Sequence, residues 1–162
     1  LFDLFYGGKS ASEAHAEGGD AEVTDIAPEP VDETTPAFRD IHIRNVWCRG
    51  ARRAMYFNGL PEMNVERVTV ENTQIYAVTG AQINESSDVV LRGVKIIPEQ
   101  GPALMLNNVK NLSAEGFVCP EGLERALVVT GSRNRSIEVS SPQITGANAS
   151  LSKGAARYVA IK

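Results

Sequence analysis

Short stretches in which apolar and polar residues alternate recur along most of the chain at a nearly constant spacing. Each copy has two apolar residues separated by one position, and a small or amide residue two positions after the second. The copies begin at Phe38, Val65, Ser86, Val109 and Asn134, so that successive starts are 27, 21, 23 and 25 residues apart. Alternation with a period of two predicts β-strands, and a repeat length in the low twenties predicts a solenoid.

A second strand is expected in each period, and it ends at an amide or hydroxyl residue. Its copies end at Asn58, Asn84, Asn107 and Thr130. We interpret residues 1–6 as the same strand one coil earlier and residues 157–161 as its last copy. The periods contain no amphipathic segment long enough for a helix, which argues against a leucine-rich repeat. The expected fold is therefore all-β, a right-handed parallel β-helix of about six coils, the first of them incomplete.

Small and amide residues recur where the strands end, and they predict the geometry of the corners. Those that follow the first strand are Asn45, Asn72, Gly93, Gly116 and Ser141. Glycine and asparagine tolerate the left-handed conformation that a tight corner needs. The asparagines that end the second strand are expected to hydrogen-bond from one coil to the next.

The two cysteines, Cys48 and Cys119, occupy the same position of the repeat, three coils apart. At about 4.8 Å per coil they would be separated by about 14 Å, whereas a disulfide needs Cα atoms within about 7 Å. Both are therefore expected to be free thiols, and they do not identify a redox compartment.

The acidic character of the chain is concentrated in one segment. Of the 162 residues, 16 are Lys or Arg and 20 are Asp or Glu, which gives a net charge of −4. Residues 9–36 contain eight acidic residues and one basic residue, with few large apolar side chains. We interpret residues 1–8 as a strand of a preceding coil, 9–36 as an acidic insertion loop containing Pro and Gly, and 37–162 as the coils and their C-terminal closure.

The acidic loop is too polar to bury a core, so a solvated loop is expected, with a lid or a partner-docking loop as the alternative. It would repel an acidic polysaccharide, so it should either lie away from any surface that binds one or hold cations there. The net negative charge and the lack of an apolar run of ~20 residues predict no binding to nucleic acid or to a membrane. Because residues 1–6 fall inside a coil, we expect the chain to be truncated at its N-terminal end.

Few residues have the pattern of a catalytic or metal-binding site. His15 lies in the acidic loop and His42 at an outward position of the first full coil, and neither has a second ligand at metal-binding spacing. No nucleophile motif and no glycine-rich phosphate loop occurs. Glu85 and Asp88 are close in sequence, but both flank a corner, where solvated charges are the ordinary interpretation. We therefore predict no catalytic residue, no metal and no cofactor in this chain.

The cluster of Arg49, Arg52 and Arg53 is the candidate substrate-binding group. A guanidinium group forms paired hydrogen bonds with a carboxylate, which suits uronate sugars. Solenoids also present long surfaces, which suit extended polysaccharides. The alternative for the same three arginines is a solvated basic turn.

Three stretches of the sequence resemble a known family. They are Leu-Phe-Asp-Leu-Phe-Tyr-Gly-Gly at residues 1–8, Thr-Pro-Ala-Phe-Arg-Asp-Ile-His-Ile-Arg-Asn-Val at residues 35–46, and Gly-Ala-Arg-Arg-Ala-Met-Tyr-Phe-Asn-Gly-Leu-Pro-Glu-Met at residues 50–63. The Gly-Leu-Pro-Glu-Met run is the most distinctive. Together they are similar to the C-terminal part of glycoside hydrolase family 28, the polygalacturonase-like pectin hydrolases, in the type common in Bacteroidetes.

The resemblance implies a β-helix that hydrolyses galacturonan-type bonds with inversion, using aspartates as general acid and base around a water molecule. It also implies a periplasmic or extracellular protein that acts on an acidic plant polysaccharide. The family carries its chemistry in Asn-Thr-Asp, Asp-Asp, Gly-His-Gly and Arg-Ile-Lys motifs, and none of them occurs here. Residues 72–74 have Gln where the first motif has its carboxylate, and residues 160–162 lack the Arg of the last.

In the family these motifs precede the region matched by residues 1–8. The resemblance therefore implies that this chain is the C-terminal part of a pectin-degrading hydrolase and is inactive in isolation. We expect it to pair with a missing N-terminal half, or to self-associate through the exposed coil end. The alternative, from a different class, is a noncatalytic β-helix module that binds carbohydrate or has a structural role.

Overall fold

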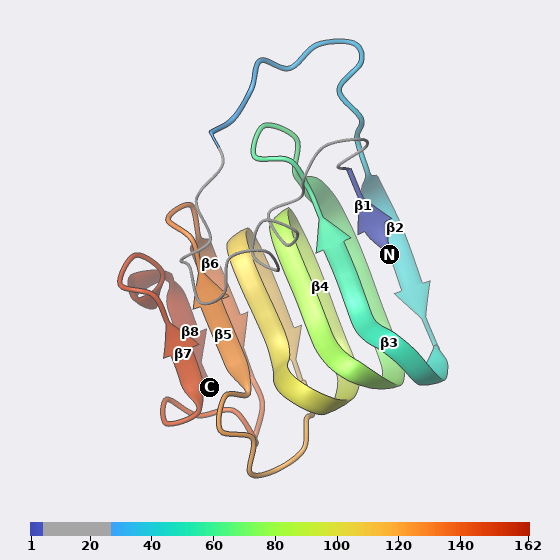
Figure 1. Ribbon diagram of the computed structural model, residues 1–162, viewed down its shortest axis with the longest axis vertical. Helices are drawn as coiled ribbons and strands as arrows, with labels where there is room; N and C mark the ends of the chain where they lie inside the picture. The colour runs from blue at the N-terminus through green and yellow to red at the C-terminus, as the bar shows by residue number, and fades with distance from the viewer. Residues whose placement is uncertain (5–26) are drawn as a thin grey trace.

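Parallel pairing between strands of successive coils organises the fold (Figure 1). The computed structural model describes residues 1–4 and 27–162. The strands are β1 (Phe2–Asp3), β2 (Arg39–Arg44), β3 (Trp47–Asn58), β4 (Val65–Glu115), β5 (Leu127–Thr130), β6 (Arg135–Val139), β7 (Ala149–Leu151) and β8 (Val159–Ile161). A short 3-10 helix, η1 (Ala156–Tyr158), precedes β8. β4 is long because its 51 residues bend round several corners without losing their pairing.

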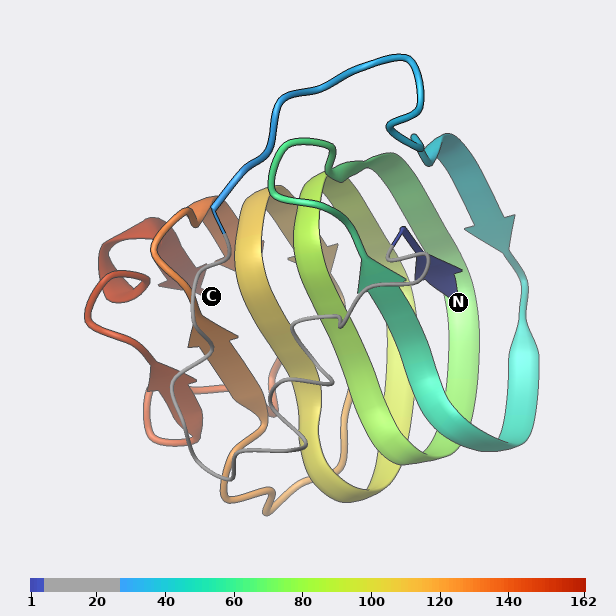
Figure 2. The same cartoon turned by 45° about the horizontal axis from the view of Figure 1, so that its top comes forward.

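The register of the strands confirms a parallel β-helix. β2 pairs with β4 so that Ile41 lies against Val68, and β3 pairs with β4 so that Phe57 lies against Ile83. Equivalent positions of the repeat therefore stack along the rod, as the sequence predicts. The stack has about five turns rather than six, because β1 supplies one strand of its coil and not a full turn (Figure 2).

The core runs along the inside of the coils. One row of the repeat contains Val68, Val89 and Leu112, which are exposed by 1% or less. Removing such side chains from water drives the stacking. Ile41, in the same row, is half-buried because β2 has a strand partner on one side only among the described residues. The expectation that this end associates with earlier coils or with a second copy stays a prediction.

The corner after the first strand has most of the predicted geometry. Asn45, Asn72, Gly93 and Gly116 all have a positive φ, between 46° and 60°. The Asn72 side-chain amide also donates to Asn45 Oδ1 at 2.7 Å. The prediction is wrong for Ser141, whose φ is not positive, because a hydrogen-bonded turn begins at its carbonyl instead.

A second row of left-handed residues, just before the first inward residue of each coil, was not predicted. It consists of Asp40, Arg67, Asp88, Asn111 and Ser136, whose φ lies between 49° and 60°. Asparagine and aspartate are the non-glycine residues that most readily adopt this conformation. The short polar side chains that occupy this position in every copy except that of Arg67 are the signal that could have indicated it. This row gives Asp88 a conformational role.

The asparagines that end the second strand bond from coil to coil, as predicted. Asn84 Nδ2 donates to Asn58 Oδ1 at 3.0 Å, and Asn107 Nδ2 donates to Thr130 Oγ1 at 2.9 Å. Asn58 in turn donates to Asp3 Oδ1 at 2.9 Å, which ties β1 to the stack. Because a buried amide without a partner is costly, these rows help to fix the register of the coils.

Cys48 and Cys119 are free thiols, as predicted. Cys48 lies against Ile75 of the next coil. Cys119 is buried, and this burial raises the pKa of its thiol above the ordinary value. A protonated, buried thiol is a poor nucleophile, so Cys119 acts as a core residue.

The C-terminal closure differs from the expectation. The interpretation of residues 157–161 as the last second strand is wrong, because β8 pairs with β6 and so continues the row of first strands. The last second strand is β7, which pairs with β5. Its sequence, Ala-Ser-Leu, has a single large apolar residue, so alternation could not identify it.

The described part of the acidic insertion, residues 27–36, forms no strand and is exposed except at Thr35. It passes over the coils as a single strap (Figure 2), and the Glu29 N–H donates to Glu62 Oε2 at 3.3 Å. His15 and the rest of residues 5–26 lie outside the described residues. In the described part of the chain, no helix has the length and apolar character needed to span a membrane.

Candidate anion-binding surface

The outer surface of the first strands carries charges that neutralise one another, and we name it the charge-paired face. Arg67 Nε lies 2.6 Å from Asp40 Oδ1. Arg92 lies between Glu71 and Glu115 and forms an ion pair with each, at 3.2 Å for Glu115. The hydrogen bond from Arg67 lowers the pKa of Asp40 below its ordinary value. Charges that are already paired in this way leave little for a ligand.

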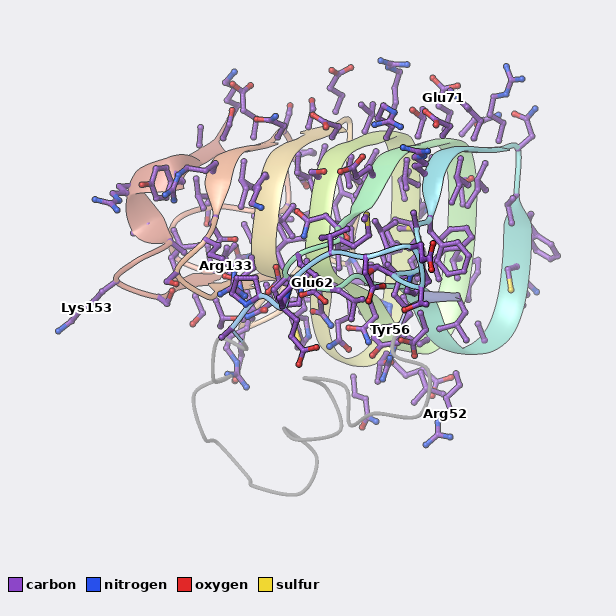
Figure 3. The ribbon with its side chains drawn as sticks, turned by 90° about the horizontal axis from the view of Figure 1, so that it is seen from above. Arg52, Tyr56, Glu62, Glu71, Arg133 and Lys153 are labelled. Carbon is purple, nitrogen blue, oxygen red and sulfur yellow. The ribbon has the colours of Figure 1, made fainter. Side chains whose placement is uncertain are left out.

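The three arginines singled out in the sequence lie in β3, which has no acidic residue and pairs with a stretch of β4 that has none either. Residues 46–58 and 73–84 stack on each other and contain Arg49, Arg52 and Arg53 but no Asp or Glu. None of the three arginines forms an ion pair with a described residue. Figure 3 shows Arg52 on the opposite side of the ribbon from Glu71 of the charge-paired face.

Aromatic rings hold two of these arginines. The guanidinium carbon of Arg53 lies 4.3 Å from the centre of the Tyr56 ring. That of Arg49 lies 4.8 Å from the centre of the Trp47 ring and 5.2 Å from that of Tyr76. Such contacts order a long side chain without neutralising its charge. The entropy that an anion must remove on binding is thereby reduced.

The three arginines do not form a single cluster. The register of β3 shifts at a bulge that contains Gly50, whose φ is +75°. Arg49 contacts its rings before the bulge, and Arg53 contacts its ring after the bulge. Arg52 is exposed and points away from the body of the rod (Figure 3). The structure therefore separates Arg49 from the other two.

Arg53 lines a cavity of about 410 Å³, which we name the arginine groove. The groove is bounded by Arg53 of β3 and by two stretches of β4 in successive coils, residues 79–82 and the corner and strand at residues 100–105. Its lining residues are Arg53, Thr79, Gly80, Ala81, Gln82, Gln100, Gly101, Pro102 and Met105. A Cβ atom at Gly80 would lie 2.2 Å from the Pro102 carbonyl oxygen, so the glycine permits the close approach of turn and strand.

The lining of the arginine groove combines a cation, amides and apolar surface. Arg53 supplies a fixed positive charge, Gln82 and Gln100 supply amide donors and acceptors, and Pro102 and Met105 supply apolar contact area. No carboxylate is among the described residues that line it. The groove is suited to binding an anion that also carries hydroxyl groups, whereas hydrolysis of a glycosidic bond needs two carboxyl groups.

A buried polar cluster lies at the corner that leads from one coil to the next. Glu85 Oε1 accepts a hydrogen bond from Asn108 Nδ2 at 2.7 Å and another from Arg133. The side chain of Glu85 is 7% exposed and that of Arg133 is 26% exposed. Among the residues that the structure describes, Glu85 Oε2 and Arg133 Nε have no hydrogen-bond partner. The three side chains come from three successive coils and tie them together.

Burial raises the pKa of Glu85 above the ordinary value of a glutamate, and the hydrogen bonds from Arg133 and Asn108 offset this only in part. A buried pair of this kind contributes little net stability, but removing one partner leaves the other charge without compensation. Glu85 lines neither the arginine groove nor the smaller cavity described below. The cluster is therefore a tie between coils.

The other candidates from the sequence do not assemble into a site. Asp88 is exposed and accepts a hydrogen bond from Asn111 at 3.1 Å. Glu85 has a different amide partner, Asn108, so the two carboxylates do not share a hydrogen-bond network. His42 is exposed on the outer side of β2. Within residues 1–4 and 27–162, no three His, Cys, Asp or Glu side chains come together as a metal would require.

Sequence reasoning missed the aromatic residues that hold the arginines. Trp47 lies two positions before Arg49, and Tyr56 lies three positions after Arg53. These short spacings between an aromatic residue and an arginine could have indicated the ring contacts from the sequence. Tyr76 belongs to the next coil, and its contact with Arg49 depends on the bulge, which the repeat pattern does not indicate.

Comparison of the chain with family models, with curated proteins and with solved structures found no match. The ligand of this protein is therefore inferred from the chemistry of the arginine groove and of the surface around it.

Proposed function

We propose that the chain binds an acidic plant polysaccharide of the galacturonan type, as the β-helix part of a polygalacturonase-like pectin hydrolase. The observation that carries this proposal is Arg53, which is ordered by an aromatic ring, has no carboxylate partner among the residues that the structure describes, and lies beside a groove lined by amides. Elsewhere on the rod, Arg67 and Arg92 are neutralised by neighbouring carboxylates. A polyanionic ligand is the partner that complements unpaired cations of this kind.

The chemistry of a uronate fits the groove group by group. Its carboxylate would pair with the guanidinium of Arg53, which Tyr56 holds in place. Its hydroxyl groups would bond with the amides of Gln82 and Gln100. The apolar face of the sugar ring would contact Met105. Small-molecule sites commonly combine apolar walls with a few polar groups in this way.

The proposal assigns binding, and not hydrolysis, to the described residues. An inverting glycosidase needs an acid and a base about 6.5–9.5 Å apart on either side of the bond. Within residues 1–4 and 27–162, no carboxylate lines the arginine groove, and Glu85 is hydrogen-bonded to Asn108 and Arg133. In this proposal the catalytic aspartates of the hydrolase belong to another part of the protein, which acts outside the cytoplasm where pectin is found.

Replacing Arg53 with glutamine should weaken the binding of trigalacturonate about tenfold, because a charge-assisted hydrogen bond contributes about 1.5 kcal/mol or more. Gln keeps much of the side-chain volume but removes the charge. The affinity would be measured by isothermal titration calorimetry at low and moderate salt. Binding should also weaken with added salt, since the contact is ionic.

The matched control is Arg92→Gln, which removes an arginine from the charge-paired face and should leave the affinity within about twofold. Maltotriose, a neutral trisaccharide, should bind far more weakly than trigalacturonate to the unaltered protein. Equal affinity for the two sugars, or an Arg53→Gln variant that binds as well as the parent, would contradict the proposal.

Incubation of the 162-residue chain with polygalacturonate should release no reducing ends above the buffer control, because the part of the chain that the structure describes places no carboxylate in the arginine groove. The assay also separates the two classes of function considered in the sequence. Sustained turnover that is abolished by Glu85→Gln or Asp88→Asn would show that the chain itself is catalytic and would overturn this assignment of roles.

A further inference from the structure

A second cavity, of about 350 Å³, lies beside the corner formed by Asn45 and Asn72. Trp47, Gln74 and Lys95 also line it, and they come from three successive coils. We name it the tryptophan pocket. It shares no lining residue with the arginine groove, so variants of the two cavities can be compared independently.

We propose that the tryptophan pocket is a second sugar-binding subsite, in which an acidic pyranoside ring stacks on Trp47 and its carboxylate pairs with Lys95. This inference rests on the proposed function, because it extends the same class of ligand to a neighbouring stretch of the coil. It adds a site and a stacking residue that the arginine groove does not contain.

Trp47 has the properties of a stacking platform. Its side chain is 61% exposed, although a large aromatic residue in this position gains nothing from contact with water. The guanidinium group of Arg49 lies 4.8 Å from its ring centre and orders it. An ordered, exposed indole offers a flat apolar surface that complements the C–H face of a pyranose ring.

The polar groups of the pocket specify an acidic sugar. The ammonium group of Lys95 forms no ion pair with any residue that the structure describes, and none of these residues places a carboxylate in the pocket. Gln74 Nε2 donates to the Tyr76 hydroxyl at 2.6 Å, which fixes the amide and leaves its oxygen as an acceptor for a sugar hydroxyl. A flat apolar face, a cation and a fixed acceptor together match a uronate ring.

The chain provides its own probe for this proposal, since Trp47 is its single tryptophan. Titration with trigalacturonate should change the tryptophan emission to saturation and protect the indole from quenching by acrylamide. Maltotriose should change it far less. Lys95→Gln should raise the half-saturating concentration of trigalacturonate about fivefold, the equivalent of one ion-pair contact, and Lys95→Arg should restore it.

Two comparisons separate this inference from the proposed function. Arg53→Gln should leave the emission change in place while it weakens the total binding seen by calorimetry. If trigalacturonate binds and Arg53→Gln weakens that binding, but Trp47 emission and quenching do not change, the second subsite is wrong and the proposed function stands. If trigalacturonate does not bind at all, both are wrong. Equal responses to maltotriose and trigalacturonate would overturn the assignment of an acidic ligand.

Discussion

A Gly80→Ala variant should lose about 3 kcal/mol or more of its free energy of unfolding, the upper range for overpacking. The added methyl group would lie 2.2 Å from the Pro102 carbonyl oxygen and 2.5 Å from that of Ala103. Both are backbone atoms of the next coil, so no side-chain rotation can relieve the clash. Relief requires the two coils to separate, which breaks their parallel hydrogen bonds. Urea denaturation followed by circular dichroism would measure the loss.

Gly146→Ala is the matched control for this change. Gly146 lies in the C-terminal closure, has no positive φ, and has no atom within 4 Å of the added methyl position. The free energy of unfolding of the Gly146→Ala variant should stay within about 0.5 kcal/mol of that of the parent protein. Equal stabilities for the two variants would contradict the close packing of the turn on β4, and with it the shape of the arginine groove.

An Arg133→Ala variant should lose about 3–5 kcal/mol of unfolding free energy at pH 7.5, because it leaves the buried carboxylate of Glu85 without its cation. The loss should be smaller at pH 5. The folded-state pKa of Glu85 is raised above its ordinary value of 4.5. The folded state therefore favours the protonated carboxyl group of Glu85. The stability that this group contributes is full below its unfolded-state pKa and is lost as the pH rises through its folded-state pKa. Without Arg133 the folded-state pKa rises further.

The double variant Glu85→Gln, Arg133→Ala isolates this effect. A neutral glutamine removes the titrating group, so the difference in stability between pH 5 and pH 7.5 that Arg133→Ala introduces should disappear. Denaturation curves for the parent and both variants at the two pH values would provide the comparison. A loss in Arg133→Ala that is the same at pH 5 and pH 7.5 would show that Glu85 is not the group responsible.

Periodicity was sufficient to predict the coils, because stacking repeats identical side-chain roles at identical positions. The rows that contain Val68 and Asn84 follow directly from aligned repeats, as does the shared row of Cys48 and Cys119. The same reasoning failed where the chain departs from the repeat. β7 has a single large apolar residue, so its sequence shows no alternation of apolar and polar positions. Ser141 begins a hydrogen-bonded turn and does not adopt the left-handed conformation of the other corner residues.

The candidate site was less accessible to sequence reasoning, for a physical reason. Arg49, Arg52 and Arg53 were recognised by their charge, but the bulge at Gly50 separates Arg49 from the other two, and a pattern of residue types does not reveal that bulge. The contact between Arg49 and Tyr76 joins two coils. The shape of the arginine groove depends on how closely the corner at Pro102 approaches Gly80 of the preceding coil. A pattern of residue types does not contain that distance.

The charge-paired face has a consequence for how this rod could change in length. Along one row Arg44, Glu71, Arg92 and Glu115 alternate in sign from coil to coil. In a solenoid each coil contacts only its neighbours, so removing one coil joins the two that flanked it. Loss of a single coil would place Glu71 beside Glu115, or Arg44 beside Arg92, and like charges directly opposite are destabilising. Loss or duplication of two coils preserves the alternation. We therefore expect this rod to tolerate the loss or duplication of coils better in pairs than singly.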